Sequence, residues 1–302
     1  MKPNNCIGLF TLSFLALWSL NPQATSAQSS QSFEIAQFSN PDSSGSVGDS
    51  FSSDLDSVRQ QRLIKPVSVD KSFAPSQASP PSPGSTIGVP SAYGASQGDG
   101  FMGFSGAVTS DKEDAAATVG MGFGDPRKSV GFEVGLGLAG LFGDNAGAGL
   151  IGFKLHRAVS RDTRVALGWA NAIRWDVASA GNTVYGSVTH RLKLQPTNNK
   201  NQLPLTMTMG LGTGAYRSIG ALDAGNNSPN LFGSLGLRII PQVSVISSWT
   251  GSQLNLGTSL ALFNNPFVIN LGITDVTGNR DFEEGRISRT GFLFSTGYAY
   301  KF

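Results

Sequence analysis

Large apolar residues alternate with small or polar residues from about residue 101 to the end of the chain. Within 128–138, for example, Val130, Phe132 and Val134 alternate with Gly131, Glu133 and Gly135. Because successive side chains of a strand point to opposite faces, this period of two predicts β-strands. We predict twelve strands, at 101–109, 114–123, 128–138, 146–156, 163–171, 183–194, 203–216, 229–239, 242–250, 253–262, 266–275 and 290–302.

The composition of the two strand faces indicates the fold class. In 203–216 one face carries Leu and Met and the other Thr and Gly, and 253–262 repeats this split. A soluble sandwich would carry charged and long polar residues on its outer face, whereas small residues suit the crowded interior of a closed barrel. We therefore predict an all-β fold, a transmembrane antiparallel up-and-down barrel of about 12 strands in residues 101–302, with the large residues facing lipid.

The lengths of the connections agree with this topology. If the N-terminus lies on the periplasmic side, the three longest connections, 172–182, 217–228 and 276–289, all fall on the outer side. Outer-membrane barrels have long outer loops and short periplasmic turns. An even number of strands also returns the C-terminus to the periplasm.

Residues 1–27 have the features of a secretory signal peptide. Lys2 provides a positive start, 6–20 an apolar stretch, and 24–27 the small residues of a cleavage site after Ala27. An uncleaved anchor is the alternative, but the apolar stretch is short for a membrane span. Cleavage would remove Cys6, the one cysteine of the chain, so we expect neither disulfides nor a cysteine nucleophile.

Residues 28–100 are rich in Ser, Gln, Pro, Asp and Gly, most markedly at 79–84. Such a composition cannot bury enough apolar surface to offset its ordering entropy, so we predict a mostly disordered linker. Within it, 53–64 could form one short helix, with Ser53 as N-cap and Pro66 just beyond. Three roles for this helix stay open: a transient helix in the linker, a plug that enters the barrel, or a contact for a periplasmic partner.

The final strand carries alternating aromatic residues and ends on phenylalanine. These residues are Phe292, Phe294, Tyr298, Tyr300 and Phe302. With the leader and the strand pattern, they resemble Gram-negative outer-membrane β-barrel proteins of the porin-like class. The resemblance implies export by the signal peptide to the outer membrane, contact with its lipid, and a last strand that serves as the signal read by the barrel-assembly machinery.

The small face of the predicted strands carries a set of mainly cationic residues. By parity these candidate pore-lining residues are Glu133, Lys154, His156, Arg164, Arg191, Lys193 and Arg238. Cationic side chains along an aqueous pore favour anions over cations. The alternative is that they pair with luminal carboxylates or with linker residues and fill the interior, because a barrel of this size can be closed by side chains.

Charge and composition limit the other functions. Lys plus Arg number 22 against 20 Asp plus Glu, so no strongly basic field indicates a nucleic-acid partner. Residues 281–284 lack the regular oxygen spacing of an EF-hand, and we expect no metal and no cofactor. His156 and His190 fall near the periplasmic end of their strands, which does not suit a hydrolase site at the outer leaflet, so we do not expect an enzyme.

Aromatic residues near the predicted strand ends are expected to anchor the barrel at the membrane interface. This set contains Trp169, Trp175, Tyr185, Trp249, Phe267 and the C-terminal aromatics. The leading hypothesis for function is a small passive pore for ions or small solutes with an anion preference. The alternative is a structural or adhesive barrel with a plugged lumen that binds a partner through its outer loops or N-terminal segment. An autotransporter-like translocator is disfavoured because 28–100 is very short for a passenger.

Overall fold

The computed structural model describes residues 82–108, 113–139, 148–175, 182–198, 201–262, 266–278 and 290–302. The leader, the possible helix at 53–64 and the acidic loop 281–284 lie outside these ranges. The described strands are β1 (Asp99–Val108), β2 (Glu113–Phe123), β3 (Gly131–Ala139), β4 (Ala148–Ala158), β5 (Thr163–Trp175), β6 (Thr183–Lys193), β7 (Pro204–Gly212), β8 (Asn230–Ile240), β9 (Val243–Trp249), β10 (Leu254–Leu260), β11 (Phe267–Thr274) and β12 (Gly291–Lys301). The 3-10 turn η4 (Gly214–Tyr216) and the short helix α2 (Ile219–Asp223) follow β7.

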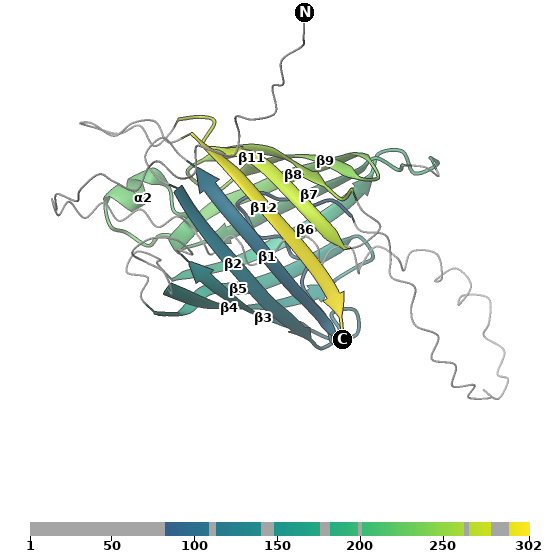
Figure 1. Ribbon diagram of the computed structural model, residues 1–302, viewed down its shortest axis with the longest axis horizontal. Coiled ribbons are helices and arrows are strands. Elements are labelled where there is room, and N and C mark those ends of the chain that lie inside the picture. The colour runs from purple at the N-terminus through teal and green to yellow at the C-terminus, as the bar shows by residue number, and fades with distance from the viewer. Residues whose placement is uncertain are drawn as a thin grey trace, which may run out of the picture. The chain divides into compact units, whose positions relative to one another are not determined.

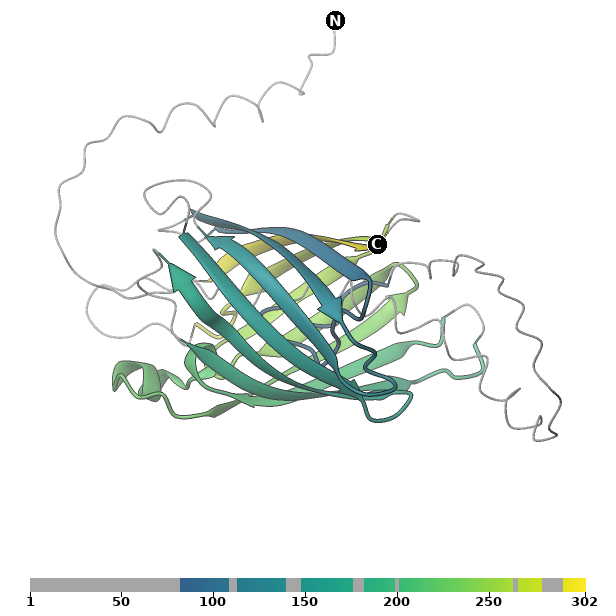
Figure 2. The same ribbon diagram turned by 90° about the horizontal axis from the view of Figure 1, so that it is seen from below.

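The twelve strands form one closed sheet. Each strand pairs antiparallel with its neighbours in the chain, and β1 pairs with β12, with Phe101 opposite Ala299. The strands run obliquely around the barrel (Figure 1), and a view turned by 90° shows them enclosing its interior (Figure 2). The predicted antiparallel up-and-down barrel and its number of strands are therefore confirmed. In the part of the chain that the structure describes, no helix is both long enough and apolar enough to cross a membrane.

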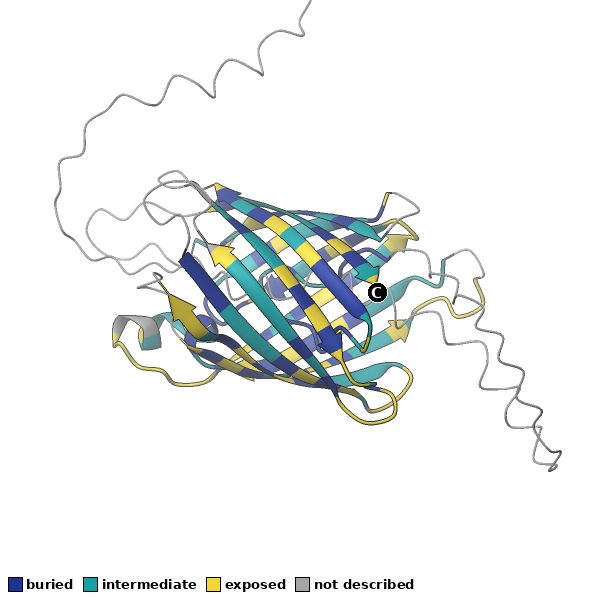
Figure 3. Cartoon of the chain, turned by 60° about the horizontal axis from the view of Figure 1, so that its bottom comes forward, coloured by how far each residue is buried: buried dark blue, intermediate teal, exposed yellow. Residues whose placement is uncertain are grey.

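The large apolar residues point outward and the small or polar residues inward. In β7, Met209 and Leu211 are 67% and 56% exposed, whereas the intervening Gly210 and the preceding Thr208 are buried. Figure 3 shows the same alternation as exposed and buried bands along neighbouring strands. An exterior of large apolar side chains suits contact with hydrocarbon, as the predicted transmembrane fold requires.

Strand β7 ends at Gly212, earlier than its alternating pattern predicts, because the chain turns inward. Gly214 has a positive φ of 59°, and a Cβ there would collide with the backbone of Thr183 and the Asn182 carbonyl. Glycine adopts this conformation without steric cost. The turn η4 then places Tyr216 inside the barrel, where it is 0% exposed.

The two ends of the barrel differ in the length of their connections. At one end, short connections join β2 to β3, β4 to β5, β6 to β7, β8 to β9, and β10 to β11. We call this the turn end. The start of β1 and the end of β12 also lie there, since Asp99 pairs with Lys301. The opposite end, which carries η4 and α2, is the loop end. It corresponds to the outer side in the predicted topology.

Some large residues of the inner face lie over glycines of the next strands. The Phe101 ring of β1 is 2% exposed and covers Gly120 of β2. A Cβ on Gly120 would overlap this ring and the Val134 carbonyl oxygen. On the next strand, a Cβ on Gly135, the register partner of Gly120, would lie 3.9 Å from the ring. Gly120 is therefore the position where space is limiting.

Replacement of Gly120 by valine should destabilise the barrel. Overpacking of this kind costs about 1–3 kcal/mol, because Phe101 or the β2–β3 pair must shift. We expect a lower urea midpoint for Gly120→Val, followed by tryptophan fluorescence and heat-modifiable gel mobility. Gly135→Ala adds a side chain to the same face at ordinary contact distance and is the matched control. Equal midpoints for the two variants would contradict the packing described here.

Candidate functional site

The interior of the barrel is occupied by residues 82–98, which precede β1. We call them the luminal segment. Ser91 and Ala92 are 0% exposed, and Ile87, Val89 and Ala95 are also buried. Apart from one isolated bridge between Gln97 and Gly122, the segment is not part of the sheet. It is held by the inner wall of the barrel on all sides.

The segment enters and leaves the barrel at the turn end. Gly84 N–H donates to Ser259 Oγ near the end of β10 (2.6 Å). Val89 reaches a cluster toward the loop end that contains Tyr185, Tyr216 and Phe232. The chain then returns to the turn end, where Gln97 N–H donates to the Gly124 carbonyl oxygen (2.8 Å), and continues into β1.

Hydroxyl groups of the wall bind the backbone of the segment. Ile87 N–H donates to Ser248 Oγ (3.2 Å) and Ala92 N–H to Thr189 Oγ1 (2.8 Å). Ser234 Oγ donates to the Ser85 carbonyl oxygen (2.7 Å). Buried backbone polar groups need such partners, and a segment outside the sheet must find them in side chains.

Glycines of the wall provide the space for this close approach. A Cβ on Gly236 of β8 would lie 2.6 Å from the backbone of Ser85, which is closer than packing permits. A Cβ on Gly257 of β10 would likewise overlap the Ile87 side chain. The small residues of the inner face therefore leave the space that the luminal segment occupies.

The sequence places residues 82–98 in the linker that was predicted to extend to residue 100, whereas the structure places them inside the barrel. The difference has a physical cause. Local composition shows only a few apolar residues, such as Ile87 and Val89, and the surface that buries them comes from distant strands. Of the three roles left open by the sequence, this position matches a plug, although it is formed by residues other than 53–64.

Three of the predicted pore-lining residues meet at one point of the segment, which we call the latch. Lys154 Nζ lies 3.4 Å from Glu133 Oε1, and both side chains are 3% exposed. Ala95 N–H donates to Glu133 Oε2 (2.7 Å), and His156 Nε2 lies 2.9 Å from the Ala95 carbonyl oxygen. Because a carbonyl only accepts, Nε2 carries the proton in this contact. The buried ion pair and the histidine thus hold both backbone groups of Ala95.

The His156 ring is also fixed by its packing. It is 2% exposed and lies between Gly94 of the segment and Gly131 of β3, where a Cβ at either position would overlap the ring. His190 is on the outer face instead, with its Nδ1 2.8 Å from Thr163 Oγ1. The two histidines therefore lie on opposite faces of the wall, and His156 is on the inner face that its parity predicts.

The remaining predicted residues lie on the inner face near the turn end. The Arg164 guanidinium is 5.3 Å from the centre of the Tyr93 ring. Arg191 Nη2 contacts Asp162 Oδ1 at 3.2 Å, and the charges of Arg191 and Arg238 are close enough to interact. Lys193 is half-buried at the end of β6. That these residues line an open pore stays a prediction.

A cavity of about 170 Å³ opens beside Arg164 at the turn end. It lies between the luminal segment, the β2–β3 connection and the last residues of β12, and Tyr93, His156 and Arg164 contribute to its walls. Two ion pairs line its mouth, Arg127 with Asp125 (3.8 Å) and Lys301 with Asp99 (3.7 Å). The segment thus leaves a small space between itself and the cationic end of the wall.

The prediction that Tyr185 anchors the barrel at the membrane interface is wrong. Tyr185 is 3% exposed and points into the lumen, where its ring meets Tyr216 and Phe232 edge-on. Tyr185 alternates in step with Ser187 and Thr189 of β6, which indicates an inward side chain. The prediction relied instead on its position near the end of the strand. Trp169, Trp175 and Trp249 are exposed on the outer surface. Trp175 and Trp249 end their strands, whereas Trp169 lies in the middle of β5, which extends beyond the predicted residue 171.

Sequence reasoning also missed the hydroxyl groups that hold the segment. These are Thr189, Ser234, Ser248 and Ser259. All lie on the small face that the alternation places inside, so parity could have identified them as luminal. Nothing in their local sequence shows that they bind a backbone. Among the described residues, no group of three His, Cys, Asp or Glu could hold a metal ion.

Together, the closed sheet, the apolar exterior and the polar inner face define a transmembrane up-and-down β-barrel with an internal segment. No protein-family model matches the chain, and a search of curated proteins finds no match. Comparison with solved structures finds the NanC porin, with 8% identity, a TM-score of 0.38 and coverage of 66% of this chain and 98% of that one.

Two further structures are similar at the same level. The outer membrane protein Omp33 of Acinetobacter baumannii has 8% identity and a TM-score of 0.37, covering 68% of this chain and 98% of that one. A mutant Rh. blastica porin has 8% identity and a TM-score of 0.31, covering 67% and 99%. These likenesses are weak, and the fold assignment depends on the barrel itself.

The latch can be tested by removing one member of its ion pair. Lys154→Met leaves the Glu133 carboxylate buried without its cation, and loss of one partner of a buried pair costs about 3–5 kcal/mol. We expect a lower urea midpoint and faster proteolysis of the luminal segment. The double variant Glu133→Gln/Lys154→Met, which buries no charge, should recover part of the stability.

The matched control is an exposed ion pair. Arg127→Gln breaks the ion pair with Asp125. The side chains of Arg127 and Asp125 are 49% and 36% exposed, and such surface pairs contribute about 0–1 kcal/mol. If Lys154→Met behaved like Arg127→Gln, the latch would not hold the segment.

Proposed function

We propose that this protein is an outer-membrane pore for small solutes or ions that is closed, in the described conformation, by its own luminal segment. One observation carries the proposal: the segment is held largely by hydrogen bonds between its backbone and wall hydroxyls, such as Thr189, Ser248 and Ser259. Water can satisfy all these groups when the segment leaves. The inner wall would then be a hydrated channel surface.

The location in the outer membrane has its own support. The exterior of the barrel is apolar, and the outer face of β12 carries Phe292 and Tyr298, which are 50% and 36% exposed. The aromatic last strand and the predicted signal peptide agree with export and with assembly by the barrel-assembly machinery. Both steps remain part of the proposal.

The position of the cations supports an anion preference in the open state. Arg164, Arg191 and Arg238 lie on the inner face near the turn end, where Arg191 forms an ion pair with Asp162 and Arg164 lies over the Tyr93 ring. A solute that passes along the vacated lumen would meet these guanidinium groups at one mouth. Fixed positive charge lowers the barrier for anions and raises it for cations.

A second candidate function is a permanently closed barrel that binds a partner through its outer loops or N-terminal segment. Two observations favour it: the buried latch at Ala95, and the packing of Val89 against Tyr185, Tyr216 and Phe232. Both contacts are specific and resist displacement of the segment. The two candidates differ in whether the segment leaves the lumen on the time scale of transport.

A disulfide that fixes the segment would distinguish them. Ala92 and Thr189 lie side by side, since Ala92 N–H is 2.8 Å from Thr189 Oγ1. We expect Ala92→Cys/Thr189→Cys to give no openings in planar bilayers when oxidised and discrete openings when reduced. The two single variants, treated with the same oxidant, are the controls.

Either of two results would refute the gated pore. If the reduced protein inserts but never opens, the closed structural barrel is favoured. If the oxidised protein, with its disulfide verified, conducts as well as the reduced protein, the luminal segment does not control the pathway.

The anion preference has a separate test. Replacement of Arg164, Arg191 and Arg238 by glutamine should lower the ratio of anion to cation permeability, measured from the reversal potential in a salt gradient. The control is Lys128→Gln in the β2–β3 connection, whose side chain is 86% exposed and lies outside the lumen. An unchanged ratio in the triple variant would show that these arginines do not set the selectivity.

A further inference from the structure

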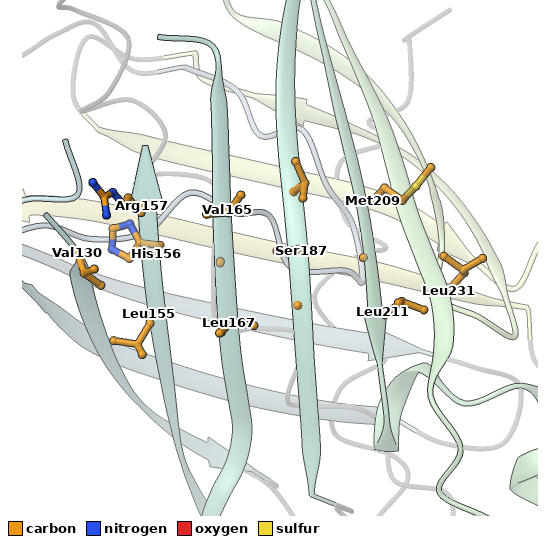
Figure 4. Close-up of a pocket in the computed structure, with 14 residues that line it drawn as sticks. Val130, Leu155, His156, Arg157, Val165, Leu167, Ser187, Met209, Leu211 and Leu231 are labelled. Carbon is orange, nitrogen blue, oxygen red and sulfur yellow. The ribbon is translucent and has the colours of Figure 1, made fainter. Parts of the chain in front are cut away.

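The outer wall of the barrel is not uniform: a groove of about 640 Å³ crosses β4 to β8 (Figure 4). Its lining is almost entirely apolar, and it lies on the face that the fold turns toward lipid. Leu167 and Met209 on its edges are 66% and 67% exposed, more than any other large apolar strand residue in the described ranges. These side chains therefore have fewer protein neighbours than the rest of the outer wall.

Two rows of outward side chains form the sides of the groove. One row runs through register partners from Leu155 across Leu167 and Leu211 to Leu231. The other runs from Arg157 through Val165 and Val188 to Met209. Because strands lie about 4.8 Å apart, the four intervals from β4 to β8 give a length of roughly 19 Å.

Gly186 leaves a gap in the first row. It stands in the first row as the register partner of both Leu167 and Leu211, where a large side chain would complete the outer surface. A Cβ at this position would meet the end of the Leu167 side chain at 3.3 Å and the Ala166 carbonyl oxygen at an ordinary contact distance of 3.9 Å. The space is thus open on the lipid side, and a larger residue could fill it without entering the lumen.

The groove crosses the membrane obliquely and has a cation at one end. Arg157 is the second-to-last residue of β4, next to the turn end, whereas Leu231 is the second residue of β8, next to the loop end. Figure 4 shows Arg157 and Leu231 at opposite ends of the groove. Arg157 is exposed and forms no ion pair with another described residue. In a barrel that spans a bilayer, residues at strand ends face the lipid headgroups, so we expect the Arg157 guanidinium at the level where headgroups meet the hydrocarbon.

We propose that this groove binds one acyl chain of an anionic phospholipid from the turn-side leaflet, with the phosphate on Arg157. The apolar rows and the gap at Gly186 accept the chain, and the guanidinium is complementary to the phosphate. The inference requires only that the barrel spans a bilayer, and it is independent of pore opening.

A second copy of the chain is a less suitable occupant of the groove. A protein interface needs a continuous complementary surface, whereas this groove is narrow and ends on a cation that a second apolar wall would leave buried and unpaired. A flexible chain with a charged head satisfies both parts of the site.

The test uses the full-length protein with Trp18→Phe, Trp175→Phe and Trp249→Phe, so that Trp169 is the one remaining tryptophan and reports from the outer face of β5. Trp169 lies two residues along the strand from Leu167. The probe is phosphatidylglycerol brominated in its acyl chains, at a few mole per cent in phosphatidylcholine vesicles. We expect Trp169 quenching well above that of random mixing, and a loss of this excess in Gly186→Leu and in Arg157→Gln.

Two controls match these variants. Ala117→Leu adds a leucine to the outer face of β2, away from the groove, and Lys301→Gln removes an exposed cation at the same end of the barrel. Both should keep the excess quenching. Heat-modifiable mobility verifies that every variant is a folded barrel.

Three results would overturn the inference. One is Trp169 quenching, in the protein without groove substitutions, equal to that expected for random mixing of the brominated phosphatidylglycerol with the other lipid. Another is equal quenching by brominated phosphatidylcholine, which would remove the role assigned to Arg157. The third is a cross-linked dimer through the groove that disappears in Gly186→Leu, which would assign the groove to a second copy.

Discussion

Closure of the sheet between β1 and β12 is the constraint on which the rest of the structure depends. In hydrocarbon, an unpaired backbone N–H or C=O costs several kcal/mol, so a sheet in a membrane cannot keep free edges. Residues Asp99–Val108 pair along their length with β12 and remove both edges. Once the sheet is closed, each side chain faces either the exterior or the lumen. That division places the large apolar residues outside and gives the inner wall its small, polar character.

The same division explains why so much of the fold was predictable from the sequence. A register slip of one residue would turn a whole strand inside out, so the alternation of Val130, Phe132 and Val134 with glycine and Glu133 specifies both strand and orientation. The alternation does not show where a strand ends if small residues continue it beyond the strand. Gly212 and Gly214 continue the period of two while the chain already turns inward, and only the packing of Tyr216 shows the end of β7.

The candidate site was predictable in its members but not in its arrangement. Parity placed Glu133, Lys154 and His156 on the inner face, and they lie there. Their arrangement depends on the N–H and C=O of Ala95, which any residue except proline would present and no sequence pattern records. The burial of the luminal segment is likewise created by twelve strands that follow it in the chain. A composition rich in Ser, Pro and Gly predicts disorder only when no such wall surrounds it.

Wall hydrogen bonds and apolar burial hold the luminal segment in place, against the conformational entropy that its ordering costs. Each exchange of a wall hydrogen bond for one with water changes the free energy by about 1 kcal/mol. Removal of a buried valine such as Val89 from its aromatic cluster costs about 1.5–3 kcal/mol. Release also returns backbone entropy of about 1–2 kcal/mol per residue, which opposes these terms. Both members of the Glu133–Lys154 ion pair belong to the wall, so the proposed opening would hydrate this pair without breaking it. In the proposed open state, water would replace the internal segment while the strand pairing that closes the sheet stays unchanged.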